Sequence, residues 1–76
     1  MSEQEYRRRL QEARNRAVRL YDRLISYSGF EAEIIRDGLL DLIQEAIPEL
    51  EQSSTQNPEK LASIIQFIQT FEDLIP

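Results

Sequence analysis

Over the first third of the chain, apolar residues recur at alternating steps of four and three, and this pattern leaves few folds open. On an α-helix, residues at that spacing lie along one stripe. The stripe consists of Tyr6, Leu10, Ala13, Ala17, Leu20, Leu24 and Tyr27. Ser2 followed by Glu5 fits a capping box at the start, and Gly29 suits the left-handed turn that ends many helices. We therefore predict a first helix over about residues 3–27.

A second apolar face follows and predicts a helix over about residues 30–47. Its members are Ala32, Ile35, Leu39, Leu42, Ile43, Ala46 and Ile47. Ser28 and Glu31 fit another capping box, which places the start near Phe30. Pro48 has no N–H and its ring crowds the preceding turn, so the helix should end or kink there. Gly38 weakens its middle by up to about 1 kcal/mol relative to Ala, which indicates either close packing or tolerated slack.

Residues 52–57 are polar and typical of a loop, and a third helix should follow over about residues 58–75. Asn57 is a good N-cap and Pro58 a good first helical residue. The apolar face of this helix covers about half of its circumference, which is wider than a single neighbouring helix requires. Its members are Leu61, Ile64, Ile65, Phe67, Ile68, Phe71, Leu74 and Ile75.

These segments predict one all-α domain over residues 1–76, either a three-helix bundle or a long helical hairpin plus a third helix. The first helix is the longest, so a simple bundle would leave Tyr6 and Leu10 without cover. Because so short a chain is near the stability limit as a monomer, we expect a homodimer that completes the fold through the first and third helices. The alternative is a monomer whose first helix frays and whose loops cover Phe67 and Leu74.

The composition excludes most catalytic and metal chemistry. The chain is 41% apolar and 30% charged, as in folded domains, and it has no His and no Cys. The commonest general base, the best metal ligands and the thiol nucleophile are therefore missing. We expect no enzyme, no catalytic residue, no metal and no cofactor. The polar amino terminus and the lack of an apolar stretch of about 18 residues predict a cytoplasmic protein that does not enter the membrane.

Charge is divided unevenly along the chain. Residues 1–24 carry seven Arg against four acids, and residues 25–76 carry two basic residues against ten acids, so the net charges are +3 and -8. Arg9, Arg16 and Arg23 recur every seven residues along one edge of the apolar stripe, and we expect them to orient an acidic neighbour. The acids available for this are Glu31, Glu45 and Glu72. The alternative is that these arginines only keep the helix soluble.

Four acids recur at steps of four on the second helix: Glu33, Asp37, Asp41 and Glu45. They should form an acidic strip opposite the apolar face. We interpret it first as a solvated surface, because exposed like charges at this spacing cost only tenths of a kcal/mol. The functional alternative is a docking strip for a basic partner.

Together these patterns predict a non-catalytic protein-protein interaction or assembly module, an adaptor or regulator that acts through apolar helix faces. The expected contact residues are Tyr6, Leu10, Phe67, Phe71 and Leu74. One alternative is a nucleic-acid-associated regulator that uses the Arg-rich first helix, although the acidic remainder of the chain opposes it. Another is an acidic inhibitor that mimics nucleic-acid charge through the second helix.

Overall fold

The computed structural model describes residues 2–75, and within this range the chain is helical and contains no strand. The elements are α1 (Glu3–Leu24), α2 (Phe30–Asp41), the π-helical η1 (Leu42–Ala46), α3 (Ile47–Gln52) and α4 (Pro58–Leu74). Residues at the α2–η1 and η1–α3 junctions keep helical dihedral angles, so these three elements form one continuous rod. The prediction of an all-α fold is confirmed.

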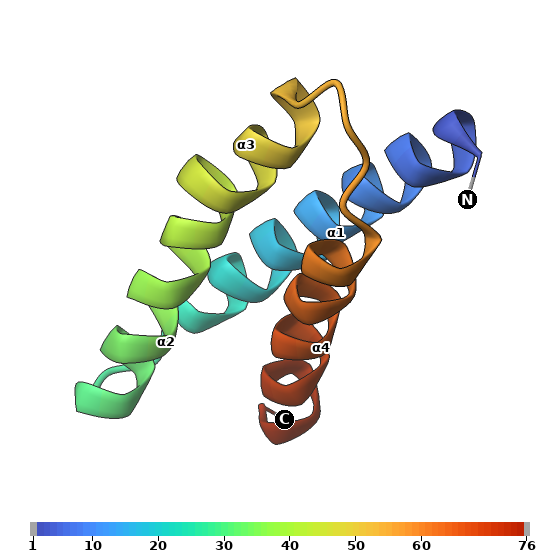
Figure 1. Ribbon diagram of the computed structural model, residues 1–76. Coiled ribbons are helices and arrows are strands. Elements are labelled where there is room, and N and C mark those ends of the chain that lie inside the picture. The colour runs from blue at the N-terminus through green and yellow to red at the C-terminus, as the bar shows by residue number, and fades with distance from the viewer. Residues whose placement is uncertain (1, 76) are drawn as a thin grey trace.

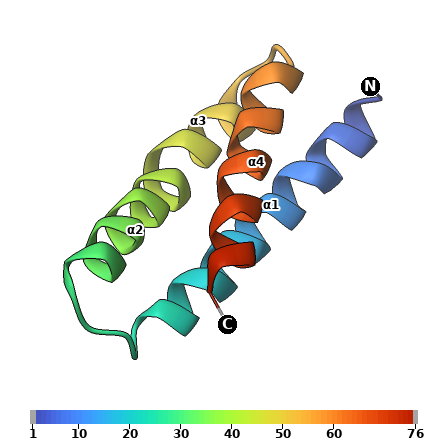
Figure 2. The same cartoon turned by 90° about the horizontal axis from the view of Figure 1, so that it is seen from below.

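Helix α1 is the element on which the others pack. The α2–α3 rod and α4 both lie against it, and they diverge toward the end where α2 begins and α4 finishes (Figures 1 and 2). The residues of the predicted stripe from Tyr6 to Leu24 are all buried, and they face both neighbours. The apolar residues that recur with the period of an α-helix thus form the side of the core that α1 contributes.

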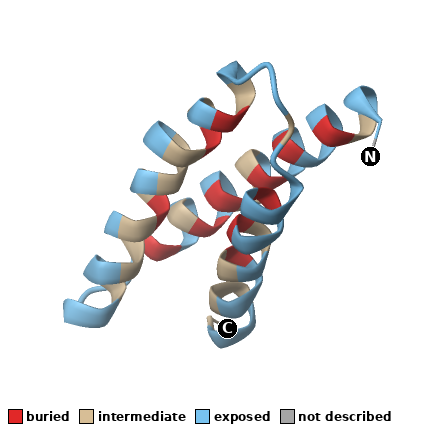
Figure 3. Cartoon of the chain, viewed as in Figure 1, coloured by how far each residue is buried: buried red, intermediate tan, exposed pale blue. Residues whose placement is uncertain are grey.

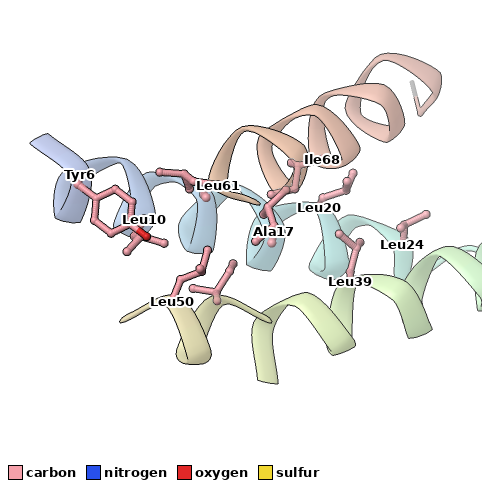
Figure 4. Packing of buried hydrophobic residues seen from close by; sticks show 12 residues of the cluster. Tyr6, Leu10, Ala17, Leu20, Leu24, Leu39, Leu50, Leu61 and Ile68 are labelled. Atoms are coloured by element: carbon pink, nitrogen blue, oxygen red, sulfur yellow. The ribbon is translucent and has the colours of Figure 1, made fainter. Parts of the chain in front are cut away.

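The core is a single apolar cluster where α1, the α2–α3 rod and α4 meet (Figure 4). Besides the six α1 residues it contains Leu39, Ile47, Leu50, Leu61, Ile64 and Ile68. No polar side chain of residues 2–75 is buried in it. Burial of apolar surface therefore stabilises this fold, without an internal polar network.

Helix α1 ends at Leu24, three residues before the predicted end. The physical reason is Arg36, whose Nη1 donates to the carbonyls of Leu24 and Tyr27, both at 2.8 Å. These bonds hold the chain in a turn where a longer helix was expected. Gly29 has a positive φ of 116°, but its ψ of 162° is not that of the predicted left-handed turn at the end of the first helix. It is instead the N-cap of α2, and the Ser28 capping box does not form.

Of the two outcomes expected at Pro48, an end or a kink, the helix does not end there, because the rod continues to Gln52. A π-helical turn precedes the proline: the Ile47 N–H bonds to the carbonyl of Leu42, five residues back. In that geometry residue 48 would donate to Ile43, and proline has no N–H to do so. Arg14 Nη1 instead donates to the Ile43 carbonyl at 3.5 Å, so a tertiary contact replaces the missing bond.

Other local expectations hold. The side chains of Ser2 and Asn57 accept hydrogen bonds from the N–H groups of Glu5 and Lys60, as N-caps do. At Gly38, an added Cβ would lie 3.1 Å from Cζ of Phe67. The glycine therefore marks close packing between α2 and α4, the first of the two explanations offered by the sequence.

Candidate docking surface

An apolar groove opens at the end of the molecule where α2 and α4 diverge. It has a volume of about 690 Å³ and lies between the turn after α1, the start of α2 and the end of α4. We call it the end groove. Leu24 is at its base, and Tyr27, Phe30, Ala32, Ile35, Leu74 and Ile75 supply most of its walls, with Ser28, Gly29 and Glu31 as its remaining lining. Figure 3 shows buried residues along the length of α1, whereas the start of α2 and the end of α4 are exposed or intermediate.

Two large apolar side chains at the end groove are left open to solvent. Phe30 is 77% exposed and Leu74 is 69% exposed. Ile25 and Tyr27 in the turn, and Ile34 one helical turn beyond Phe30, are also exposed. Since an apolar lining with few polar groups suits binding more than chemistry, the end groove is the candidate functional site.

The local sequence explains why the groove forms here. Because α1 stops at Leu24, Tyr27 leaves the buried stripe and its ring lines the groove. Arg36 fixes the carbonyls of the turn, and the positive φ of Gly29 redirects the backbone into α2. If α1 continued to Tyr27, this residue would stay on the buried stripe and would not line the groove.

The structure corrects part of the predicted contact set. Tyr6 and Leu10 are only 2% and 1% exposed within one chain, so they are core residues and not an uncovered interface. The reason is that the rod continues past Pro48, and Leu50 together with Leu61 then reaches the first turns of α1 (Figure 4). Phe67 and Phe71 are half-buried and pack on each other with ring centroids 4.8 Å apart. Leu74 alone of the five is largely exposed.

The arginines predicted to orient a neighbour are engaged within the chain. Arg9 pairs with Glu5 at 3.4 Å, and Arg23 donates to the carbonyl of Ile75 at 3.1 Å. Arg16 makes two bonds to Glu72, from Nη2 to Oε1 at 2.6 Å and from Nε to Oε2 at 3.3 Å. This pair joins α1 to α4, as the expected acidic neighbour would.

The Arg16–Glu72 pair also governs the titration of both groups. Hydrogen bonding to Arg16 lowers the pKa of Glu72 below its ordinary value, against a smaller opposing effect of desolvation. The same hydrogen bond raises the pKa of Arg16. At the start of α1, hydrogen bonds from Gln56 and then Arg7 lower the pKa of Glu3. The first two shifts mark a contact between α1 and α4, and the third marks a contact between α1 and the loop before α4. None of these groups lines the end groove.

A second tie was missed by the sequence reasoning. Arg14 Nη2 bonds to the Glu51 carboxylate, and Arg7 Nη1 donates to the Glu51 carbonyl at 3.0 Å. The expected partners Glu31 and Glu45 form no such pair within residues 2–75. Glu51 lies beyond Pro48, where no helix was predicted, so its position over α1 followed only from the continued rod.

The predicted acidic strip lies in solvent. Glu33, Asp37, Asp41 and Glu45 are all exposed on the outward face of the α2–α3 rod. Within residues 2–75 no group of three or more acids is arranged to hold a metal ion. Phe30 and Ile34, which were not predicted as contact residues, lie on this same face. Their spacing of four places them together on the helix but away from Ile35 and Leu39, and this spacing could have indicated a second, exposed apolar patch.

The chain was compared with protein-family models, curated proteins and solved structures. None of them matches it. Among the helices of residues 2–75, none combines the length and the apolar character that crossing a membrane requires.

Proposed function

We propose that this chain is a non-catalytic protein-interaction module that docks a helical segment of a different protein in its end groove. The supporting observation is that Phe30 and Leu74 stand largely exposed on a concave apolar surface. Scattered exposed apolar residues are ordinary, but several that line one cavity are typical of a binding site. An amphipathic helix is the usual occupant of such a groove.

Charge favours a partner other than a second copy. The α2–α3 rod, residues 30–52, carries seven acids and one Arg, and one of those acids, Glu31, lines the groove. Two copies joined at this end would bring these carboxylates together. A partner with Lys or Arg beside its apolar residues would be attracted instead.

The surface area of the chain also favours a monomer over the expected homodimer. The accessible surface of the chain is 5130 Å², and a monomer of its 9.0 kDa mass is expected to expose about 4,900 Å². With Tyr6 and Leu10 inside the core, the exposed apolar surface that could support self-association lies mainly at the end groove and on the neighbouring face of α2. Sedimentation at rising concentration distinguishes this case from the proposed one.

A position-specific photo-crosslink tests the proposal in the source cells. The photoreactive residue p-benzoylphenylalanine replaces Phe30 in one variant, Leu74 in a second and Val18 in a control. Val18 is an exposed apolar residue of α1 that does not line the groove. We expect one defined protein adduct at both groove positions and none at Val18.

The adduct must also depend on the groove. Tyr27→Ser in the Phe30 crosslinking variant should reduce its yield, because Tyr27 lines the cavity without being the reactive position. An adduct of twice the chain mass would show that the occupant is a second copy, against the proposal. Equal yields at all three positions would show non-specific contact and reject it.

A further inference from the structure

The outward face of α2 combines exposed apolar and acidic residues in one line. At 100° per residue, Phe30, Ile34, Asp37 and Asp41 fall within an arc of about 60°. All four are exposed, with Phe30 at 77% and Ile34 at 54%. Glu45, one turn further in η1, is exposed as well. We call these five residues the α2 stripe.

The stripe is apolar at its first end and acidic at its second. Phe30 belongs both to the stripe and to the wall of the end groove, so the two surfaces are continuous. Asp37, Asp41 and Glu45 form no side-chain hydrogen bond or ion pair with any residue of 2–75. Arg36, the one basic residue of the rod, is bound to the carbonyls of Leu24 and Tyr27. Nothing on the rod itself therefore offsets the charge of the stripe.

We propose that the α2 stripe binds a cationic amphipathic helix of the partner, with apolar residues on Phe30 and Ile34 and Lys or Arg on Asp37, Asp41 and Glu45. This inference rests on the proposed function and specifies the chemistry of its partner. The distance from Phe30 to Glu45 along the rod is about 22 Å, so the partner helix needs about four turns. Opposite charges specify its direction, because reversal would place cations on Phe30 and apolar residues on the acids.

A second copy of the chain does not present such a helix. Its one basic helix is α1, and the apolar stripe of α1 from Tyr6 to Leu24 is buried against the other rods. Nucleic acids and anionic lipid surfaces would be repelled by the acids of the stripe. A helix of another protein, with apolar residues near one end and basic residues near the other, matches the apolar and the acidic ends of the α2 stripe.

The experiment uses the full chain and a synthetic probe peptide. The probe is a capped, Ala-based helix of 18 residues with Leu at positions 2 and 6 and Lys at positions 9, 13 and 17, labelled for fluorescence anisotropy. The test variant is Asp37→Asn with Asp41→Asn. The control variant, Glu49→Gln with Glu59→Gln, changes the net charge equally at two exposed acids off the stripe. Circular dichroism establishes that both variants keep their helicity.

We expect the test variant to weaken binding at least tenfold and the control variant less than threefold. Phe30→Ser should also weaken it at least tenfold. A variant with Asp37→Lys and Asp41→Lys should lose the Lys probe and bind a probe with Glu at positions 9, 13 and 17. That reciprocal exchange would establish direct pairing at the stripe.

Three results would overturn the inference: no saturable binding up to about 1 mM, which corresponds to a negligible affinity; equal weakening by test and control variants; or no effect of Phe30→Ser. None of them bears on the crosslinks at Phe30 and Leu74. If those crosslinks persist while the stripe variants bind normally, the end groove remains the docking site and only the α2 stripe is rejected. If the crosslinks fail, the proposed function itself is rejected.

Discussion

The hydroxyl of Tyr6 accepts a hydrogen bond of 3.0 Å from the backbone N–H of Asn57. Tyr6 is in the second turn of α1 and is 2% exposed, and Asn57 is the N-cap of α4. One side chain therefore fills the core and also holds the residue that begins the last helix. This explains why a tyrosine is the first of the buried residues of α1, which are otherwise aliphatic.

Tyr6→Phe should lower the free energy of unfolding by about 0.5–1.5 kcal/mol, because the ring stays packed while the Asn57 N–H loses its partner. Urea denaturation measures the change. Tyr27→Phe, which removes an exposed hydroxyl, should change stability by less than about 0.5 kcal/mol. Equal effects of the two substitutions would contradict the role given to the Tyr6 hydroxyl.

Gly29→Ala should destabilise the fold by about 1 kcal/mol or more, because Gly29 has a φ of 116° that L-residues rarely adopt. An added Cβ meets no atom within 4 Å, so strain in the backbone is the only cost. Chemical synthesis with D-alanine at this position separates backbone strain from a steric effect of the added Cβ, because a D-residue adopts a positive φ without strain. D-Ala should retain the stability of the parent chain, and a loss as large as that of L-Ala would indicate a steric origin.

Arg36→Met should cost about 1.5–3 kcal/mol, since it removes charged hydrogen bonds to the carbonyls of Leu24 and Tyr27 and keeps the apolar stem. Hydrogen exchange should show the loss concentrated in residues 24–30. Arg19→Met, at an exposed position of α1, is the matched control and should stay within about 0.5 kcal/mol. Uniform loss of protection along the chain would count against a local role.

The Arg16–Glu72 pair should make stability depend on pH in the acid range. The pKa of Glu72 is lowered in the fold, so its contribution is present above the ordinary value of 4.5 and is lost as the pH falls through the folded value. Glu72→Gln should therefore cost about 0.5–1 kcal/mol at pH 7 and nothing in strong acid. Urea midpoints measured across this range give the difference between the two chains. A cost that persisted in strong acid would mean that packing, and not charge, is responsible.

Gly38→Ala should have a small net effect in the parent chain, because a gain of about 1 kcal/mol in helix propensity opposes the approach to Phe67. In a Phe67→Leu background that approach is relieved, and the same substitution should become stabilising by about 0.5–1 kcal/mol. Thermal unfolding of the four chains of this cycle measures the coupling. Additive effects would show that the ring of Phe67 does not limit residue 38.

Much of the fold follows from local pattern. The buried residues of α1 are those that the four-and-three spacing selects, and Ser2 and Asn57 begin their helices because a side-chain oxygen satisfies a free N–H. These features depend on residues within a few positions of one another. They could therefore be predicted from the sequence alone.

The end groove depends on contacts between distant residues and could not be predicted. A local rule ends or kinks a helix at Pro48, but here a π-helical turn precedes the proline and Arg14, 29 residues from Ile43, binds the Ile43 carbonyl. That continuation buries Tyr6 and Leu10 and moves the uncovered apolar surface to the other end of the molecule. Phe30 could be recognised from the sequence as a helix start, but its exposure depends on how far α4 diverges from α2.

That divergence has a consequence for what the end groove can admit. The two helices that form its walls, α2 and α4, both pack on α1, and they approach each other closely at Gly38 and Phe67. The end of α4 is also held on α1 by the Arg16–Glu72 pair and by Arg23, which donates to the carbonyl of Ile75. The width of the end groove is therefore set by the angle between α2 and α4, and these contacts fix that angle at the end of the molecule where the groove opens.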